Sequence, residues 1–433
     1  MRRLPIILLV IFSMTYQSCD STLNIDKPND FYKYIGEDGD QTAVDMVVDA
    51  DGSAYILGTT NTGNSGLQIY LVKTNTLGEV QWTRTYGDAV DETPKDIEMF
   101  SDGTLVVLAD KTNAGNNDFV VYFISKADGS ETKAHFERAA NTTDDHANSI
   151  TETKDGGFVV AGYVNSGSFK SGNLYRYSND MITEYPAWTT DINQNGTSFG
   201  SGYDVVPVKV VQPDVGVFLT FGYTNTPNGD GNPDYDFFIL KTSDLNGNNG
   251  GFFSVPGVDV SSNERLTDVK VVPNGGYLLT GYTSSSNGTL QGIYTAWIRS
   301  TIVGLDDFTD PSRFLVGDPT KNPHKITLDP APVGSPMASC FPNSNSEFFI
   351  LGMQGLNGDN NLYLTKLDSK MSNAWGDARP SRLFGGDGDD ASATVAQTPD
   401  GRLLVVGTMV LGDLKGQRKI VLMNLSSDGM FEN

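Results

Sequence analysis

The sequence contains very little cysteine, and this scarcity limits the folds and sites that it can build. Of its 433 residues only Cys19 and Cys340 are cysteines, so a framework of several disulfides is excluded. Cys19 belongs to an N-terminal segment with features of its own, described below. Cys340 would then be a lone thiol, which we expect to be a small core residue rather than a nucleophile.

Histidine is also scarce, and familiar catalytic motifs are missing. The three histidines, His135, His146 and His324, lie in different sequence contexts and lack the spacing of metal ligands. The sequence contains no glycine-rich phosphate loop. Acidic residues are plentiful, so a pair of carboxylates for glycoside chemistry stays open.

Basic residues are few compared with acidic ones. The chain has 30 Lys and Arg against 53 Asp and Glu, which gives a formal net charge of -23. Such a surface repels phosphate backbones, so we exclude nucleic acid as a partner. The same charge favours solubility and attracts cations, but it does not identify a function.

Apart from its N-terminus, the sequence lacks long apolar segments with helical spacing. Arg2 and Arg3 precede an apolar run from Leu4 to Met14, and Ser18 and Cys19 follow. This is the layout of a signal peptide, and the run is too short to span a bilayer. The ending resembles a bacterial lipobox, in which the cysteine after the cleavage site receives a lipid. The alternative is an ordinary cleaved signal peptide.

The N-terminal segment predicts where the protein resides. We expect residues 1–18 to be the signal peptide and residues 19–30 to be a lipidated Cys19 with a polar tether. Several acyl chains on one residue anchor a protein stably. We therefore expect attachment to the outer membrane of a Gram-negative cell, at the cell surface rather than on the periplasmic face.

The remaining sequence, residues 31–433, contains a repeat. Its 47 glycines and its 10% aromatic residues accompany short runs of Val, Ile, Leu, Tyr, Phe and Thr that Asn, Asp and Gly interrupt, as in an all-β chain. Asp-Gly and Asn-Gly supply the positive φ of tight hairpins. The turn and the strand after it recur seven times: Asp51–Gly58, Thr104–Ala109, Asp155–Gly162, Val217–Gly222, Asn274–Gly281, Glu347–Gly352 and Asp400–Gly407.

The repeat unit combines an acidic pair, an Asp-Gly-Gly-Tyr/Phe turn, an apolar strand, a Gly-Tyr or Gly-Thr step and a third strand that ends in Lys-Thr. This pattern resembles the β-propeller repeats of secreted bacterial lipoproteins. The resemblance implies a single all-β propeller of seven four-stranded blades, and it implies no reaction. Because Phe31–Gly36 is similar to the blade endings Trp82–Gly87 and Ser381–Gly385, we expect it to supply the outer strand of the last blade and close the ring.

The pattern of one loop indicates a calcium site, and calcium is the one cofactor that the sequence suggests. Oxygen-bearing side chains alternate there as they do in calcium loops, although the EF-hand spacing fails because no Glu stands at the twelfth position. A bare turn is the alternative, since Asn and Asp also bond their own backbone. The five residues are Asn228, Asp230, Asn232, Asp234 and Asp236.

A second feature is cyclic, because acidic residues recur just before the inner strand of most blades. We expect them to form a ring at the mouth of the central channel, on the rim with the longer connections. Such a ring could hold a cation or cationic ligand; alternatively, its members bond amides of neighbouring blades. They are Asp40, Asp91, Glu92, Asp144, Asp145, Glu264, Asp389 and Asp390.

Two functions remain open at this point. The first is a non-enzymatic binding or scaffold module whose partner is a protein, such as an outer-membrane transport or secretion complex, or a glycan. The alternative is a propeller-type carbohydrate-active enzyme, either a glycoside hydrolase or a polysaccharide lyase. Trp188, Trp297 and Trp375 could stack on sugars, although such residues more often belong to the core of a blade.

Overall fold

The structure is a computed structural model, and its description covers most of the chain from residue 30 onward. The described residues are 30–61, 66–113, 115–138, 143–178, 188–192, 199, 202–226, 234–255, 262–273, 275–286, 288–298, 325–326, 338–356, 359–376, 379–385, 388–412 and 416–431.

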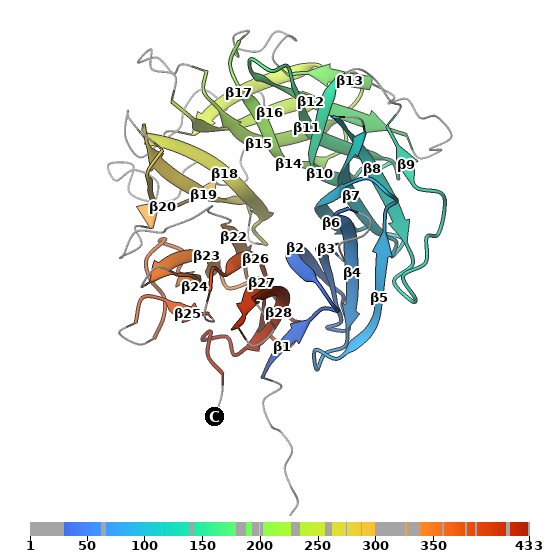
Figure 1. Cartoon of the computed structure of the whole chain (residues 1–433). Coiled ribbons are helices and arrows are strands. Elements are labelled where there is room, and N and C mark those ends of the chain that lie inside the picture. Colours follow the sequence, from blue (N-terminus) through green and yellow to red (C-terminus); the bar gives the residue numbers. More distant parts are fainter. Residues whose placement is uncertain are drawn as a thin grey trace, which may run out of the picture.

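The described strands form seven antiparallel sheets of four strands each, arranged as blades around a central axis (Figure 1). This confirms the predicted all-β propeller. Blades 1 to 3 consist of β2 (Asp40–Val48), β3 (Ala54–Asn61), β4 (Gln68–Thr74), β5 (Val80–Tyr86); β6 (Glu92–Met99), β7 (Leu105–Asn113), β8 (Asn116–Ile124), β9 (Phe136–Glu137); β10 (Asp144–Glu152), β11 (Phe158–Asn165), β12 (Lys170–Tyr177) and β13 (Trp188–Asp191).

The remaining blades repeat this plan, with the first strand of each blade innermost. Blades 4 to 7 consist of β14 (Val205–Asp214), β15 (Val217–Thr224), β16 (Asp236–Ser243), β17 (Asn249–Val255); β18 (Ser262–Val271), β19 (Tyr277–Ser285), β20 (Leu290–Ile298), β21 (Lys325–Ile326); β22 (Ser339–Pro342), β23 (Phe348–Leu356), β24 (Asp359–Leu367), β25 (Arg382–Phe384); and β26 (Ala391–Gln397), β27 (Leu403–Leu411), β28 (Gln417–Leu425) with β1 (Phe31–Ile35).

The hairpin between the first and second strands forms because its sequence supplies a capping carboxylate and a glycine. In blade 2, the Asp102 carboxylate accepts a hydrogen bond from the Thr104 amide at 2.8 Å. Gly103 follows with a φ of 84°, a left-handed conformation that glycine adopts without steric cost. The turn fixes the register of strands whose side chains are then buried on both faces.

The core lies between blades rather than within one layer. Among the described residues, the buried apolar side chains gather in seven clusters, one at each contact between adjacent blades. For example, Leu57 of β3 and Val107 of β7 belong to the cluster between blades 1 and 2. Burial on both faces explains why the second and third strands have nearly continuous apolar sequences.

The ring closes through the N-terminal strand, as predicted. β1 pairs with β28 in antiparallel register, from Phe31 opposite Asn424 to Ile35 opposite Ile420. The two ends of the described chain therefore lie in and beside the same blade (Figure 1). No helix among the described residues is long and apolar enough to cross a membrane.

Candidate functional site

A central cavity of about 1110 Å³ lies inside the ring of inner strands. Its lining includes residues at the start of the inner strands, so it opens on the rim with the longer connections. An equivalent position near the end of the second strand faces this cavity in five blades. These residues are Thr59, Tyr163, Tyr223, Met353 and Thr408. The rim is therefore hollow rather than flat, which is the geometry that favours a small-molecule or glycan site.

Glycine places the tyrosines on the cavity wall. The inner strands of blades 3, 4 and 5 each contain a bulge opposite the Gly-Tyr step of the second strand. A Cβ atom added to Gly222 would lie 2.2 Å from the Val206 carbonyl oxygen, and the corresponding distances are equally short at Gly162 and Gly281. Glycine, which has no Cβ, lets the bulged strand come this close in these three blades. The next residue, such as Tyr223, then lies at the cavity.

His146 of β10 is held between two carboxylates. Its Nδ1 lies 2.9 Å from Asp110 Oδ2, and its Nε2 lies 3.4 Å from Asp144 Oδ2. The hydrogen bond with Asp110 is the main cause that raises the pKa of His146, while burial opposes the rise. Lys95 pairs with the same Asp110 oxygen at 3.1 Å. Asp110 therefore contacts both His146 and Lys95, and Lys95 lines the cavity.

Tyr163 is directly opposite His146 in the β10–β11 ladder, and their rings stack with centroids 4.9 Å apart. Burial raises the pKa of Tyr163 to about 12, and Asp110 adds to the rise. Lys170 Nζ lies 4.9 Å from the centroid of the same ring. Tyr163 is thus a neutral phenol whose ring contacts both the His146 imidazole and the Lys170 ammonium group.

His146, Tyr163, Tyr223 and Arg265 follow one another around the ring, and we call them the arc. Its other side is built on Arg265 of β18. Its guanidinium lies 4.2 Å from the centre of the Tyr235 ring, and the Tyr235 hydroxyl donates to Asp204 Oδ2 at 2.5 Å. Burial acts to lower the pKa of Arg265, but contacts with the Tyr282 and Tyr235 phenols raise it overall. Arg265 therefore stays charged. A third tyrosine, Tyr223, packs edge-on against Tyr235, with the ring centroids 5.7 Å apart.

Half of the predicted acidic ring bonds the backbone of neighbouring blades. In each case a carboxylate at the start of one blade accepts a hydrogen bond from an amide at the start of the third strand of the preceding blade. The backbone amide of Leu67 donates to Asp91 at 2.7 Å, that of Asn117 to Asp144 at 3.0 Å, that of Asn360 to Asp389 at 3.3 Å and that of Arg418 to Asp40 at 3.0 Å. Asp204, which the prediction omitted, accepts from Lys170 in the same way at 2.8 Å.

The other half of the predicted ring is buried. Tyr122 donates to Glu92 at 2.7 Å, and Thr283 donates to Glu264 at 3.0 Å. Asp145 accepts from Tyr175 at 2.9 Å and pairs with Arg138, and Asp390 accepts from the Val410 amide at 3.1 Å. Of the eight predicted residues, Asp40, Asp389 and Asp390 line the central cavity.

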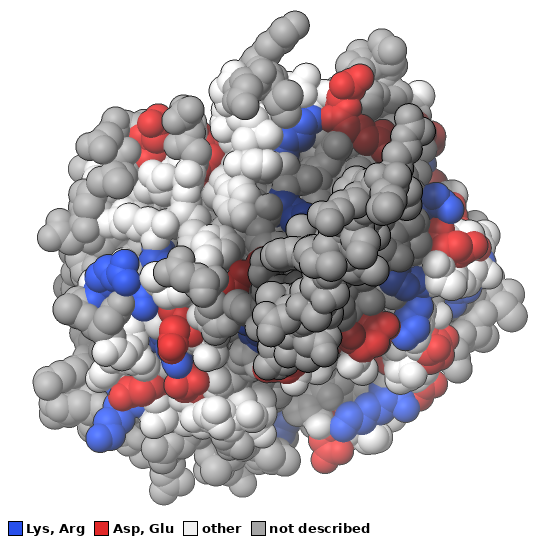
Figure 2. Space-filling view, turned by 90° about the horizontal axis from the view of Figure 1, so that it is seen from below, with Lys and Arg blue, Asp and Glu red and all other residues white. Residues whose placement is uncertain are grey.

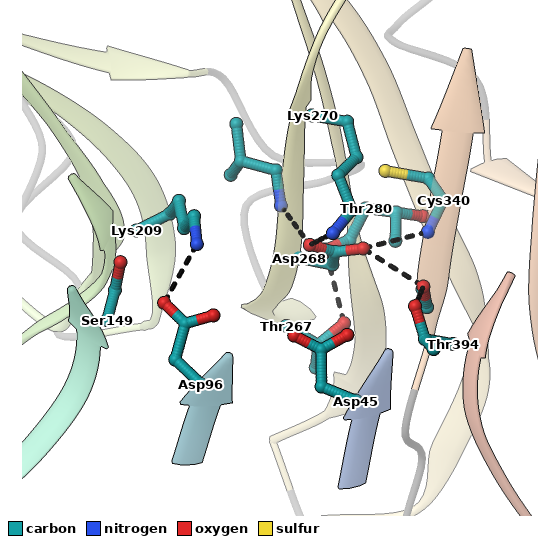
Figure 3. Close-up of polar contacts among 12 residues, drawn as sticks. Asp45, Asp96, Ser149, Lys209, Thr267, Asp268, Lys270, Thr280, Cys340 and Thr394 are labelled. Carbon is teal, nitrogen blue, oxygen red and sulfur yellow. Dashed lines mark hydrogen bonds and ion pairs between the residues drawn. The ribbon is translucent and has the colours of Figure 1, made fainter. Parts of the chain in front are cut away.

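Below the arc, the cavity wall along the ring axis carries a network of charges (Figure 3). Lys209 Nζ lies 2.8 Å from Asp96 Oδ2, and Lys270 Nζ lies 3.6 Å from Asp268 Oδ1. The second Asp268 oxygen accepts a hydrogen bond from the Cys340 amide at 3.0 Å. The Lys209–Asp96 and Cys340–Asp268 contacts join inner strands of different blades, whereas Lys270 and Asp268 belong to the same strand, β18.

Two carboxyl groups in this network have raised pKa values. Burial raises the pKa of Asp45 to about 6; Lys270 opposes the rise, whereas Asp96 adds to it. Burial also raises the pKa of Glu98, to about 7, against the effect of Lys209. Both acids therefore exchange protons near neutral pH.

Other predicted positions are placed differently by the structure. Cys19 and three residues of the predicted calcium loop, Asn228, Asp230 and Asn232, lie outside the described residues. Asp234 and Asp236 are described, and Asp236 is buried at the start of β16. Within the described part of the chain, no group of three or more His, Cys, Asp or Glu residues is arranged to hold a metal ion.

Cys340 and the tryptophans belong to the core. Cys340 is buried in β22, where burial raises the pKa of its thiol. Trp188, Trp297 and Trp375 pack against the clusters between blades, and the Trp188 indole donates to the Asp244 carbonyl at 2.7 Å.

Sequence reasoning did not find the arc formed by His146, Tyr163, Tyr223 and Arg265. His146 lacks the spacing of a metal ligand, so the sequence alone does not single it out as a functional residue. One signal was available: the second strand ends in Gly-Tyr at Gly162-Tyr163, Gly222-Tyr223 and Gly281-Tyr282, in three successive repeats.

Comparison with known proteins gives matches of fold alone. No protein-family model and no curated protein matches the chain. An ulvan lyase, described as a new family of polysaccharide lyase, matches with 10% identity over 92% of this chain and 97% of that chain, with a TM-score of 0.54. An ulvan lyase bound to -[GlcA(1-4)Rha3S]- matches equally in identity and coverage, with a TM-score of 0.52. An α-L-arabinanase of Penicillium chrysogenum matches with 14% identity over 77% of this chain and 93% of that chain, with a TM-score of 0.44.

These matches correct the first expectation about function. The interpretation as a non-enzymatic binding or scaffold module is wrong, because ulvan lyases are among the solved structures that share this fold along nearly their whole length. They favour the alternative that the sequence left open, a propeller-type carbohydrate-active enzyme. The sequence does not distinguish this alternative because the residues that line the cavity come from all seven blades.

Proposed function

We propose that the protein is a polysaccharide lyase that cleaves an acidic, uronate-containing glycan in its central cavity. The observation that carries this proposal is the position of two phenols, Tyr163 and Tyr223, on the cavity wall. His146 stacks on the first phenol, and Arg265 stacks on Tyr235 beside the second. A β-elimination requires a base, an acid and a group that binds the carboxylate, and an ionised phenol, a neutral phenol and the neighbouring basic side chains can supply these.

In this reaction the cations bind the carboxylate of a uronate residue and stabilise the negative charge that develops on it. One tyrosine, ionised to the phenolate, takes the proton from C5, next to the carboxylate, and the other, as the neutral phenol, supplies the proton for the leaving oxygen. A double bond forms between C4 and C5, the bond from C4 to the glycosidic oxygen breaks, and that oxygen receives a proton. No water is consumed. We assign the proton transfers to Tyr163 and Tyr223, and the binding of the carboxylate to His146 and Arg265.

Two further observations support a lyase over a hydrolase. Solved ulvan lyases share the fold, so this architecture can carry polysaccharide cleavage. A glycoside hydrolase requires two carboxyl groups that face the substrate. Of the carboxylates that line the cavity, Asp96 and Asp268 instead pair with Lys209 and Lys270. The others accept hydrogen bonds from backbone amides; they are Asp40, Asp45, Asp389 and Asp390.

The activity is tested by incubating the mature chain with polygalacturonate, alginate, chondroitin sulfate and ulvan, and following the ultraviolet absorbance of unsaturated uronate products. We expect one of these polymers to give product. Tyr163→Phe, Tyr223→Phe and Arg265→Ala should each lower the rate by about 100-fold or more. Tyr277→Phe is the matched control, because Tyr277 is buried at the opposite end of β19, away from the cavity. Equal rates for all four variants would contradict the assignment.

We also propose that the enzyme is attached to the outer membrane through Cys19, with its propeller exposed to extracellular glycans. The support for this placement is the basic, apolar and cysteine-ended N-terminal segment. A surface-anchored lyase would meet polymers that are too large to enter the cell.

A further inference from the structure

Exposed aliphatic side chains gather on the rim opposite the cavity mouth. This rim, which we call the turn rim, carries the hairpins between the first and second strands of the blades and the connections from the third strand to the fourth. Five large aliphatic residues that are exposed lie at or beside these hairpins, and none in the described part of the chain lies on the cavity rim. The five are Leu77, Val80, Val215, Leu245 and Val271.

Val215 and Leu245 are the most exposed of the five, and they lie at two adjacent hairpins of blade 4. They are 73% and 87% exposed. The Asp244 amide donates to the Gly216 carbonyl at 3.0 Å, and this bond holds the two hairpins together. Residues at hairpin tips are normally polar or glycine, and an aliphatic side chain in water gains free energy when it is buried. The two tips therefore indicate a surface built for contact.

The acidic residues next to these tips each face a basic group. Asp244 Oδ1 accepts a hydrogen bond from Arg176 Nε at 3.2 Å, and Asp244 Oδ2 accepts one from the Gln212 side chain at 2.8 Å. Lys154 Nζ lies 3.9 Å from Asp214 Oδ1. An opposite charge offsets part of the cost of removing water from a carboxylate. The tips of blade 4 are therefore suited to contact with an apolar surface.

The chain enters the propeller at the same rim. Asp30, the first described residue, pairs with Arg402, which follows the hairpin between β26 and β27. The Phe31 ring packs against Gly78 of the hairpin between β4 and β5 so closely that a Cβ atom would not fit there. The segment that precedes residue 30 therefore joins the protein on the turn rim, beside the exposed Leu77.

The length of that segment keeps the turn rim near the proposed anchor. The chain from Cys19 to Asp30 reaches at most about 40 Å when fully extended. Such a tether gives the bilayer a high effective concentration at the rim, so weak contacts suffice to orient the protein. Blades 1 and 4, which carry Leu77 and Leu245, are as far apart as a ring of seven blades allows (Figure 1). Contacts at both blades would hold the disc flat on a surface.

We propose that the turn rim docks on the lipid surface to which the chain is anchored, so that the cavity mouth points away from the membrane. The aliphatic tips would be buried among the lipids. The proposal rests on the anchor at Cys19 that the proposed function includes, and it does not depend on the lyase reaction. The outer wall at the closing strand mixes acidic and basic groups with uncharged surface (Figure 2). Docking on the turn rim leaves the cavity open to large polymers.

The test measures which rim meets the lipid. The mature chain, with a hexahistidine tag in place of Cys19, is held on phosphatidylcholine vesicles by a nickel-chelating lipid. An environment-sensitive dye is attached through Asn246→Cys, beside the blade 4 tips, or through Ser168→Cys, on the cavity rim; both positions are exposed, whereas Cys340 is buried. We expect lipids that carry a nitroxide on the acyl chain to quench the dye at position 246 and not the dye at position 168.

Substitutions then show whether the aliphatic tips cause the contact. Leu245→Asp combined with Val215→Asp should abolish quenching of the dye at position 246, while the tag still holds the chain on the vesicles. Leu383→Asp is the matched control, because Leu383 is a leucine that is 42% exposed but lies on β25, an outer strand. It should leave the quenching unchanged.

Equal quenching of the two dyes, or quenching at position 168 alone, would overturn the proposal. Quenching at position 246 that survives the double substitution would also overturn it, because the contact would then not depend on the aliphatic tips. The tag replaces the lipid on Cys19, so the result is independent of lipid attachment in the cell and of lyase activity. If the dyes behave as expected but Cys19 carries no lipid in cells, the anchor assignment fails and the assignment of the turn rim as a lipid-binding face stands.

Discussion

The imidazole of His146 lies flat against the phenol ring of Tyr163, with an angle of 26° between the two planes and 4.9 Å between the centroids. The two residues are opposite each other in neighbouring strands, so the ladder itself holds the pair together. Asp110 from the next blade fixes the imidazole from the other side. The arrangement depends on blade-to-blade packing as much as on the local strand.

The first prediction concerns the protonation of His146. Replacing Asp110 by Asn should lower the pKa of His146, because the hydrogen bond to this carboxylate is the main cause of its rise. A lower pKa leaves less of His146 protonated at a given pH, so the rate of cleavage near neutral pH should fall and should recover as the pH is lowered. Nuclear magnetic resonance titration of the imidazole and a pH–rate profile measure the two effects. Asp128→Asn, an exposed turn residue of the same blade, is the control.

The contact between His146 and Asp110 also predicts a change in stability with pH. Because the folded state raises the pKa of His146, its contribution to stability is complete below the ordinary value of about 6.5 and is lost as the pH rises through the raised value. The Asp110→Asn chain should lack this dependence. An unchanged titration of His146 in Asp110→Asn would show that another group sets its charge.

The second prediction tests the glycines that admit the bulged inner strands. Gly222→Ala would place a Cβ 2.2 Å from the Val206 carbonyl oxygen and 2.6 Å from the Phe238 ring. We expect the free energy of unfolding to fall by about 1–3 kcal/mol, and the rate of cleavage to fall as well because Tyr223 is displaced. Gly376→Ala is the control, since an added Cβ there meets no heavy atom within 4 Å. Equal denaturation midpoints for the two variants would disprove the steric explanation.

The third prediction concerns the charge network along the axis. The folded state raises the pKa of Asp45 to about 6, so the folded chain keeps a proton that the unfolded chain releases above about pH 4. The free energy of unfolding should therefore fall as the pH rises from about 4 to 7. Asp45→Asn should remove this part of the loss and make the chain more stable than its parent at pH 8. Urea unfolding at pH 5 and pH 8 tests this, and an identical pH dependence in the two proteins would refute it.

The fourth prediction concerns anchoring. Cys19→Ala should abolish metabolic labelling with a clickable fatty acid, because the thiol of Cys19 is the proposed site of lipid attachment. Cys340→Ala should keep the label, since Cys340 is buried in β22. Label retained by Cys19→Ala would show that another residue carries the lipid.

The sequence predicted the fold well because each blade repeats local signals. Asp-Gly turns, apolar strands and the similarity of Phe31–Gly36 to other blade endings are sufficient to predict seven blades and their closure, and β1 pairs with β28 as expected.

The candidate site could not be predicted in the same way, because it depends on contacts between blades. Asp110 and His146 belong to different repeats, and only the ring brings them within hydrogen-bonding distance. Tyr163 and Arg265 are about 100 positions apart in the sequence. The Gly-Tyr step in three successive repeats was visible, but its meaning depends on the bulge in the inner strand, which no local pattern reveals.

The central claim is tested most directly by the products formed in heavy-oxygen water. The mature chain is incubated with the acidic polysaccharide that it degrades fastest, and the new chain ends are examined by mass spectrometry. Elimination through Tyr163 and Tyr223 predicts unsaturated uronate ends and no heavy oxygen in either fragment, because no water is consumed. Saturated ends that carry heavy oxygen would show hydrolysis and contradict the account, as would the absence of cleavage of every acidic polysaccharide tested.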